Sequence, residues 1–357
     1  MHFADRLDAA IKAKGNPICL GLDPRFTELP QSLTAAAIRQ HGQTVRAVAE
    51  SFITFNRAIL DALCDLVPVC KPQIAFYEEF GAEGLRAYEA TIQYAHKKGL
   101  LVISDAKRGD IGSTAVAYAR AHLGGESIRG VTAGFDADAL TVNPYLGRET
   151  LAPYLEVGVP GGRGIFVLVK TSNPGSGDLQ DLLLKPPGPK PGTPKPVYEH
   201  VAEMVHDLGR AYRGECGLTD VGAVVGATYP EVAHSLREIM PDTILLIPGF
   251  GAQGGRAKDA VAGFREDGRG AIVNNSRGIL FAYKQEPYAK TYGERDFAGA
   301  ARAATLAMAA ELKTALAAAR ETVSDSAPRR PARTGAPAPK KSARTGRRAV
   351  GAPRGRK

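Results

Sequence analysis

Cysteine is scarce in this chain of 357 residues, and long apolar runs are absent. The four cysteines, Cys19, Cys64, Cys70 and Cys216, form no CxxC pair and have no histidine partners at the intervals of a zinc site. This spacing argues against a disulfide framework and a metal cluster, so we expect free thiols in a reducing compartment. The first residues lack the apolar core of a signal peptide, and no apolar run approaches the roughly 20 residues of a membrane span. We therefore expect a cytoplasmic protein without a membrane segment.

Acidic residues are nearly absent from the C-terminal end of the chain, where the positive charge is concentrated. The formal net charge is +9, but residues 324–357 carry 11 lysines or arginines and one acid, which leaves residues 1–323 at −1. This tail is rich in alanine, proline and glycine and has no apolar periodicity, so we expect it to be disordered. It contains no aromatic residue for base stacking, which argues against sequence-specific nucleic-acid recognition. Weak, salt-sensitive binding to an anionic partner is the alternative that its charge allows.

Eight short apolar runs predict eight β-strands, each followed by a segment that can form a helix. Several runs are continuously apolar, as parallel strands covered on both faces are. Strict alternation of strands and helices implies a parallel sheet, and eight units are the number that closes a (β/α)8 TIM barrel. The apolar content of 44% is sufficient for such a core. The predicted strands are residues 18–23, 66–71, 100–107, 139–143, 164–170, 221–227, 243–248 and 271–275.

Three of the predicted helices can be described further, by the position we expect for them or by the residues at their ends. Residues 1–14 form an amphipathic pattern that we expect to cover the bottom of the barrel. A helix over residues 115–123 has Ser113 and Thr114 as candidate N-caps. A long helix is predicted over residues 296–320, directly before the basic tail.

A proline-rich insertion interrupts the repeat. Residues 174–196 contain seven prolines, so we expect neither helix nor central strand there, but a long loop over the rim of the barrel or a disordered excursion. The predicted organisation is a catalytic barrel domain over residues 1–320, with this insertion at 174–196, and a disordered tail over residues 321–357.

Polar residues gather where the predicted strands end. In a TIM barrel the carboxyl ends of the strands form the catalytic rim, so these positions are candidates for an active site. For any single residue, capping of the following helix is an equally good explanation, but the whole set is harder to explain in that way. The residues are Asp23, Lys71, Asp105, Lys107, Asn143, Lys170, Ser172 and Arg277.

Two carboxylates and a lysine lie close together where the third predicted strand ends. Side chains alternate along a strand, so Asp105 and Lys107 are expected to point the same way, with Asp110 following after a glycine. Lys71 ends the preceding strand, and because adjacent strands lie about 5 Å apart it can reach Asp105. Such an alternating array stays ionised through mutual pairing. A structural ion pair on a surface loop is the alternative.

A second constellation follows the last two strands. A glycine-rich loop covers residues 247–255, and Arg277 follows the eighth strand. The loops after strands seven and eight of this barrel often bind phosphate through backbone N–H groups, and an arginine can add a bidentate charge. We expect a phosphate cradle here, with a flexible turn and an incidental arginine as the alternative.

With these residues in place, the chain resembles orotidine 5′-phosphate decarboxylase, in the subfamily with longer chains. The similarity runs from about Asp5 to about Ala310, and the motifs occur in the expected order on six different strands. The motifs are Asp23 in Gly21-Leu22-Asp23, Lys71, Asp105-Ala106-Lys107-Arg108-Gly109-Asp110-Ile111, Thr171-Ser172-Asn173-Pro174-Gly175, Pro248-Gly249-Phe250-Gly251-Ala252-Gln253-Gly254-Gly255 and Arg277.

The resemblance implies catalytic roles for four residues, Lys71, Asp105, Lys107 and Asp110, and a substrate contact for Thr114. Lys107 would donate a proton to C6 of the pyrimidine, Asp105 would sit beside the departing carboxylate, and Lys71 would bridge Asp105 and the ribose. Asp110 and Thr114 would reach into the active site of the partner subunit, so that a homodimer shares its sites.

The resemblance also implies substrate contacts. Asp23 would bind a ribose hydroxyl, Ser172 the edge of the pyrimidine, and Arg277 the phosphate. Gln253 would lie at the base and phosphate. Further residues expected to line the site are Asn143, Pro248 and Gly254.

The implied reaction is the conversion of orotidine 5′-monophosphate to UMP and CO₂, the last step of de novo pyrimidine nucleotide biosynthesis, without a metal or an organic cofactor. The alternative is a Mg²⁺-dependent sugar-phosphate decarboxylase or aldolase of the same barrel suprafamily, which shares the Asp-x-Lys-x-x-Asp pattern. The ammonium of Lys71 disfavours a nearby divalent cation, whereas a carboxylate in its place would favour one.

Overall fold

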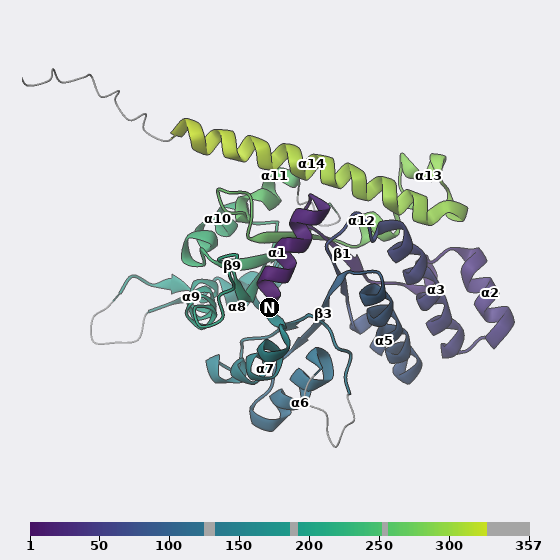
Figure 1. The fold of residues 1–357 in the computed structure, drawn as a ribbon, viewed down its shortest axis with the longest axis horizontal. Helices are drawn as coiled ribbons and strands as arrows, with labels where there is room; N and C mark the ends of the chain where they lie inside the picture. The colour runs from purple at the N-terminus through teal and green to yellow at the C-terminus, as the bar shows by residue number, and fades with distance from the viewer. Residues whose placement is uncertain (125–132, 186–191, 252–255, 327–357) are drawn as a thin grey trace, which may run out of the picture.

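Eight parallel strands form a closed barrel in the computed structural model, which describes residues 1–124, 133–185, 192–251 and 256–326 (Figure 1). Around the barrel the order is β1-β10-β9-β8-β5-β4-β3-β2, and β2 pairs with β1 to close it. This confirms the predicted TIM barrel and all eight predicted strands. The strands are β1 Ile18–Leu22, β2 Val69–Pro72, β3 Leu101–Arg108, β4 Ala139–Val142, β5 Gly164–Lys170, β8 Thr219–Val225, β9 Thr243–Ile247 and β10 Ala271–Asn275.

The strand boundaries differ from the sequence prediction by up to three residues. The largest difference is at β2, whose predicted start, Leu66, lies in a turn where its N–H donates to the carbonyl of Leu63 at 2.9 Å. Apolarity alone does not separate a buried turn from a buried strand.

Side chains of the strands are buried on both faces of the sheet. On β1, Cys19 packs inside the barrel, whereas Ile18 and Leu20 pack outward against the helices. This double burial explains why the strands appear in the sequence as continuous apolar runs rather than as alternating ones.

The first helix, α1 Phe3–Lys14, closes the bottom of the barrel as predicted. Phe3 and Leu7 join the interior cluster, and the Phe3 ring meets that of Phe166 edge to face, with centroids 5.9 Å apart. Asp220 on β8 accepts the N–H of Ala4 at 3.0 Å, which satisfies a donor in the first turn of the helix. The bottom is therefore a packed end, and the opposite rim remains for chemistry.

The other helices surround the barrel (Figure 1). Helix α3 shows how the sequence sets an end, because Thr44 precedes it and its Oγ1 accepts the N–H of Ala47 at 3.3 Å. The helices are α2 Gln31–His41, α3 Val45–Leu63, α4 Ala75–Glu78, α5 Gly81–Lys97, α6 Gly112–Leu123, α7 Ala152–Gly158, α8 Gly177–Gln180, α9 Val197–Gly209, α10 Pro230–Ile239, α11 Ala257–Ala260, α12 Arg277–Leu280, α13 Tyr288–Thr291 and α14 Phe297–Ser326.

The predicted N-caps of α6 are wrong. The helix begins at Gly112, so Ser113 and Thr114 lie in its first turn, and Ile111 is the residue before it, without a side-chain cap. The preceding residue, Asp110, accepts the N–H of Ile111 at 2.8 Å and thereby shapes the entry into the helix.

The insertion at residues 174–196 contains more regular structure than predicted. A 3-10 turn, Pro174–Ser176, leads into the short helix α8, and β6 Leu183–Leu184 pairs antiparallel with β7 Lys195–Pro196 outside the barrel. The exclusion of helix was wrong because six of the seven prolines lie at 186 or beyond, and Pro174 starts a turn, where its missing N–H has no cost. Residues 186–191 lie outside the described residues.

The C-terminal helix α14 extends to Ser326, beyond the predicted end at 320 and the predicted start of the tail. Residues 320–326 contain neither proline nor glycine, and the next such residue along the chain is Pro328. Residues 327–357, on which the prediction of a disordered basic tail rests, lie outside the described residues. Within the part that the structure describes, no helix is both long and apolar enough to cross a membrane.

Candidate active site

A buried ion-pair array lies at the carboxyl ends of β2 and β3. Lys71 Nζ lies 2.6 Å from Oδ2 of Asp105, and Lys107 Nζ lies 2.6 Å from Oδ1 of the same carboxylate. Lys71 and Asp105 are 5% and 7% exposed, whereas the side chain of Lys107 is 44% exposed. Three of the four members of the predicted array, Lys71, Asp105 and Lys107, therefore meet within one chain, and Lys107 is the accessible end. The fourth, Asp110, forms no ion pair with them.

The charges of this array hold one another in the ionised state. Burial by itself would raise the pKa of Asp105, but the ammonium groups of Lys71 and Lys107 hold it well below its ordinary value. Burial would lower the pKa of Lys71, but Asp105 and then Asp23 raise it above its ordinary value. The Lys71–Asp105 pair therefore stays charged across the whole range between the ordinary pKa values of the two groups, about 4 to about 10.

Thr141 on β4 is a member of the site that sequence reasoning missed. Its hydroxyl donates to Oδ1 of Asp105 at 3.0 Å and accepts the N–H groups of Ala106 and Lys107 at 3.0 and 2.9 Å. The side chain thus fixes both the carboxylate and the backbone that carries the lysine. A single threonine inside an apolar strand matches no sequence motif. Its role in the site becomes visible only when β4 is paired with β3 in the structure.

The backbone at Lys107 is unusual. Its φ angle is +48°, in the left-handed region that residues with a side chain rarely adopt, and the β3–β4 register shifts between Ser104 and Arg108. A local irregularity of this kind re-aims a side chain at the end of a strand, and such conformations are concentrated at functional sites. Here it brings Lys107 back onto Asp105.

Asp23 follows β1 and lies beside the array. Its Oδ1 atom is buried and has no hydrogen-bond partner among the described residues. Burial raises the pKa of Asp23, and the positive charge of Lys71 opposes this shift. A buried carboxylate oxygen without a partner is costly unless a ligand group donates to it, which fits the predicted contact with a hydroxyl.

The expected phosphate cradle lies across the rim. Pro248 follows β9, and Gly249 and Gly251 have φ angles of +99° and +69°, so this loop needs glycine at both positions. Arg277 begins α12 after β10 and is exposed, and its side chain has no hydrogen bond or ion pair within the described part of the chain. The cradle therefore offers an unpaired positive charge. The predicted Gln253 and Gly254 lie outside the described residues.

The position of Arg277 depends on how closely the residue before it, Ser276, packs against β1. A Cβ atom on Gly21 would lie 2.6 Å from Cβ of Ser276, so only glycine at this position of β1 lets the loop that holds Ser276 pack against the strand.

Ser172 and Asn143 occupy the rim in different ways. Ser172 is half-buried in the loop after β5, where it packs so closely on Gly226 that a Cβ there would lie 2.9 Å from that of Ser172. Asn143 is exposed after β4, and its amide oxygen accepts the N–H of Tyr145 at 3.0 Å. Asn143 thus makes a local turn contact, which does not by itself support its predicted role in lining the site.

Asp110 and Thr114 do not join the array of their own chain. Asp110 is half-buried and forms no ion pair among the described residues, and Thr114 is exposed. Ile111, between them, is a large apolar side chain that is 60% exposed. The segment that contains them faces outward, as the prediction of a contribution to a second subunit requires.

Lys170 lies at the carboxyl end of β5, as predicted, but its side chain is buried in an ion pair with the insertion. Its ammonium lies 2.5 Å from Oδ1 of Asp181 and 3.3 Å from Oγ of Ser176. It also lies over the rings of Tyr198 and Tyr229, at 5.4 and 4.9 Å from their centroids. Sequence reasoning missed these partners, because nothing in the spacing marks Asp181 as the counter-ion.

The fold and these contacts define a (β/α)8-barrel enzyme whose charged groups gather at the carboxyl ends of its strands. The sequence model of the family described as orotidine 5′-phosphate decarboxylase / HUMPS matches residues 16–292, and the chain belongs to this family.

Relatives and solved structures agree with this assignment. The chain is 46% identical to orotidine 5′-phosphate decarboxylase of Rhodopirellula baltica, over 88% of this chain and 99% of the relative. It is 41% identical to the enzyme of the same name from Clostridium novyi, over 86% and 97%. The structure of Leishmania donovani OMP decarboxylase superposes with a TM-score of 0.63 at 30% identity, covering 88% of this chain and 99% of that one.

Proposed function

We propose that this protein decarboxylates orotidine 5′-monophosphate to UMP and CO₂, the last step of de novo pyrimidine nucleotide biosynthesis. The observation that carries the proposal is the closed Lys71–Asp105–Lys107 array at the catalytic rim, in a chain that is 46% identical to a relative of that name over 88% of its length. A cytoplasmic location is part of the proposal and stays a prediction.

Lys107 is the residue that we assign to proton donation. When the C6–carboxylate bond breaks, the electron pair remains on C6 in the plane of the ring, where the π system cannot delocalise it. A positioned ammonium stabilises this carbanion and then transfers its proton to C6. Of the two lysines in the array, Lys107 is accessible to a ligand, whereas the Lys71 side chain is only 6% exposed and remains held by Asp105.

Asp105 and Lys71 prepare the site for this step. Asp105 stays ionised and would lie beside the substrate carboxylate, so that their repulsion ends when neutral CO₂ leaves. Lys71 holds Asp105 in place and would also reach the ribose. Binding of the remote phosphate can offset the repulsion in the bound ground state.

The remaining rim residues are assigned to binding. We propose that Asp23 accepts a hydrogen bond from a ribose hydroxyl, Ser172 contacts the edge of the pyrimidine, and Arg277 pairs with the phosphate. The unpartnered oxygen of Asp23 and the unpaired guanidinium of Arg277 support the first and third assignments. Gln253, Gly254, Pro248 and Asn143 stay predictions as lining residues.

The proposed assembly is a homodimer in which Asp110 and Thr114 complete the partner's site. The exposed segment that contains Ile111 and Thr114 supports this arrangement. An anionic partner for the basic tail stays a prediction, because residues 327–357 lie outside the described residues.

A direct assay tests the proposed function against the Mg²⁺-dependent alternative. Purified protein is mixed with orotidine 5′-monophosphate without added metal, and substrate loss is followed by ultraviolet absorbance. Because the ammonium of Lys71 stands where a metal site would need a carboxylate, we expect turnover to change by less than about twofold after treatment with EDTA. Loss of activity in EDTA that Mg²⁺ restores would contradict the metal-free reaction and favour the alternative.

A further inference from the structure

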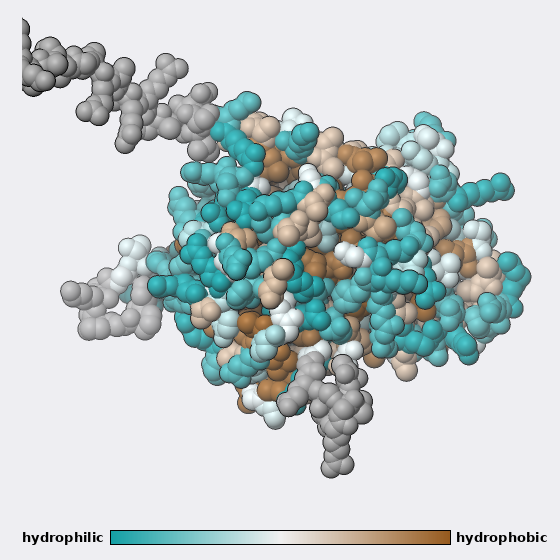
Figure 2. All heavy atoms as spheres, viewed as in Figure 1, coloured by the Kyte–Doolittle hydropathy of each residue, from teal (hydrophilic) through white to brown (hydrophobic). Residues whose placement is uncertain are grey.

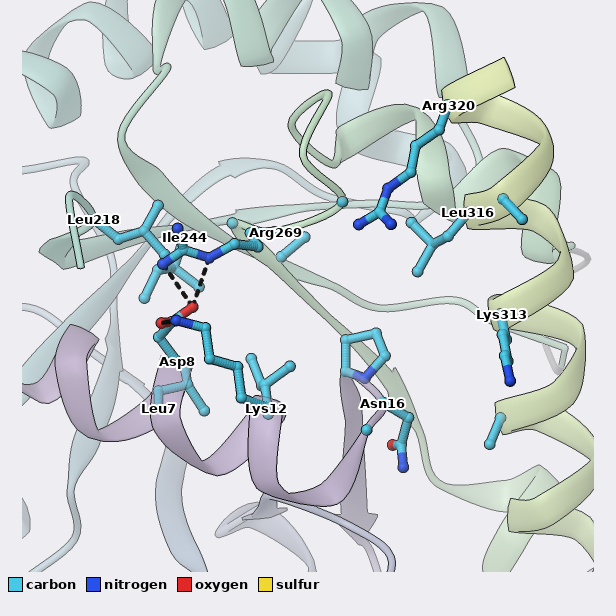
Figure 3. Close-up of a pocket in the computed structure, with 18 residues that line it drawn as sticks. Leu7, Asp8, Lys12, Asn16, Leu218, Ile244, Arg269, Lys313, Leu316 and Arg320 are labelled. Carbon is cyan, nitrogen blue, oxygen red and sulfur yellow. Dashed lines mark hydrogen bonds and ion pairs between the residues drawn. The ribbon is translucent and has the colours of Figure 1, made fainter. Parts of the chain in front are cut away.

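We propose that a pocket at the bottom of the barrel is a second ligand site, for a small organic anion with an apolar body. The pocket has a volume of about 330 Å³ and lies between α1, the starts of β1 and β10, and α14 (Figure 3). This volume falls within the range of pockets that bind small molecules. The two helices that enclose it come from opposite ends of the sequence, so the pocket exists only in the folded chain.

The walls of this bottom pocket are mainly apolar. Leu7 and Ile11 contribute from α1, Leu218 and Ile244 from the barrel, and Leu316 from α14. Figure 2 shows the same end of the barrel as a mostly hydrophilic surface in which apolar side chains are visible along α14. An apolar body can therefore be buried here with a favourable free energy.

The charged groups of the pocket have a positive excess. Four cations line it, Lys12, Arg269, Lys313 and Arg320, against the single carboxylate of Asp8. Asp8 is already shared, with Lys12 Nζ 2.6 Å from its Oδ2 and an Arg269 nitrogen 2.8 Å from its Oδ1. Arg269 has a second carboxylate partner, since one of its nitrogens lies 3.8 Å from Oδ2 of Asp267. The positive excess of the lining therefore comes from Lys313 and Arg320, and it favours a further negative charge.

Lys313 supplies the positive charge that is free to bind. It is exposed on α14, and its side chain has no hydrogen bond or ion pair with any residue that the structure describes. Ala309 and Ala317 lie one helical turn on either side of it and also line the pocket, so small side chains leave room beside the ammonium. Arg320, further along the helix, donates to the backbone carbonyl of Asp267.

The positive charge of the pocket argues against the basic tail of the chain as its ligand. The basic tail, with 11 lysines or arginines between residues 324 and 357, follows α14 directly, but it would be repelled by the cations of the wall. The pocket begins where β1 and β10 begin, whereas Asp23 and Arg277 follow the other ends of these strands. A ligand in the pocket therefore does not overlap with the substrate site.

Binding of 2-naphthoate, measured by isothermal titration calorimetry, tests this site. We expect wild-type protein to bind it, the neutral analogue 2-naphthylmethanol to bind at least about tenfold more weakly, and Lys313→Glu to weaken naphthoate binding by about tenfold or more. Ala317→Phe, which fills the pocket and keeps its charges, should also weaken binding. Lys290→Glu is the matched control, since this lysine is 82% exposed on α13 and does not line the pocket.

Three outcomes would overturn the proposal. They are the absence of naphthoate binding at millimolar concentration, equal binding by Lys313→Glu and wild type, and displacement of naphthoate by UMP, which would place the probe in the substrate site.

A separate observation concerns the insertion, and we infer that residues 174–181 act as a strap that positions Ser172. This inference rests on the proposed contact of Ser172 with the pyrimidine. The strap is attached to the rim through the two residues that directly precede Ser172. Lys170 pairs with Asp181, and Thr171 forms two hydrogen bonds with Gln180, to its amide oxygen at 3.0 Å and from its amide nitrogen at 2.8 Å.

Burial makes the attachment of the strap specific. The Lys170 side chain is 2% exposed, and a buried ammonium needs a counter-ion, which only the strap supplies among the described residues. Asp181 is therefore a positioning residue, since it acts on the substrate through the loop between Lys170 and Ser172.

The test compares two acidic residues of the same segment. We expect Asp181→Asn to raise KM for orotidine 5′-monophosphate by about tenfold with kcat within about threefold, since binding rather than chemistry is affected, and Asp181→Glu to restore most of the loss. Asp178→Asn is the matched control, because Asp178 lies on α8 without an ion pair among the described residues and should behave as wild type. Ser172→Ala is measured in parallel.

The results distinguish a failure of the strap from a failure of the proposed contact between Ser172 and the pyrimidine. If Ser172→Ala raises KM but Asp181→Asn does not, the strap is wrong and the substrate contact stands. If Ser172→Ala has no effect, the proposed contact itself is wrong, and the inference about the strap is lost with it.

Discussion

Replacing Lys107 with alanine is expected to lower the rate of decarboxylation by about 10⁴-fold or more, while the affinity for UMP changes by less than about tenfold. The variant removes both the charge that stabilises the C6 carbanion and the proton that is delivered to it. Binding changes less, because the proposed contacts to ribose, pyrimidine and phosphate come from Asp23, Ser172 and Arg277. The loss should therefore appear in kcat rather than in KM.

The folded state should survive this change. Asp105 keeps its 2.6 Å contact with Lys71 and the hydrogen bond from Thr141, so no buried charge loses all its partners. Single-turnover kinetics and UMP titration measure the two effects, and a thermal melt checks the fold. Lys97→Ala, an exposed lysine on α5, is the matched control. Near-normal turnover by Lys107→Ala would show that another group donates the proton.

The contact between Lys71 and Asp105 could be predicted from the sequence because it depends on two general rules. Continuous apolar runs locate parallel strands, and the last polar residues of adjacent strands meet at the same rim. Both side chains lie at strand ends in the sequence, and the structure places them 2.6 Å apart. The barrel and the centre of the site therefore follow from patterns of burial.

Other contacts could not be predicted, for physical reasons that differ between residues. Thr141 acts through the shifted register of β3 and β4, which no pattern within β4 encodes. Asp181 meets Lys170 because a turn and a short helix fold the chain back over 11 residues. Sequence patterns detect which residues are buried, whereas these contacts depend on the path of the backbone between elements.

The proposed dimer gives the second large effect. Asp110→Ala should lower activity by at least about 100-fold, although Asp110 makes no contact with the array of its own subunit. If Asp110 completes the partner's site, the effect follows from loss of a charge beside the partner's Lys107. This loss alone does not show which subunit uses the residue, so a complementation experiment is needed.

Mixing the two inactive variants identifies the subunit that Asp110 serves. In a heterodimer of Lys107→Ala with Asp110→Ala, shared sites would leave one site with both defects and the other with neither. Random reassortment makes half of the dimers mixed, so about a quarter of wild-type activity should return. Asp105→Asn mixed with Lys107→Ala is the control, since the two residues contact each other within one subunit and every site would keep a defect. Recovery only in the first mixture supports sharing across the dimer, whereas no recovery in either mixture, with subunit exchange verified by a labelled chain, would assign Asp110 to its own barrel.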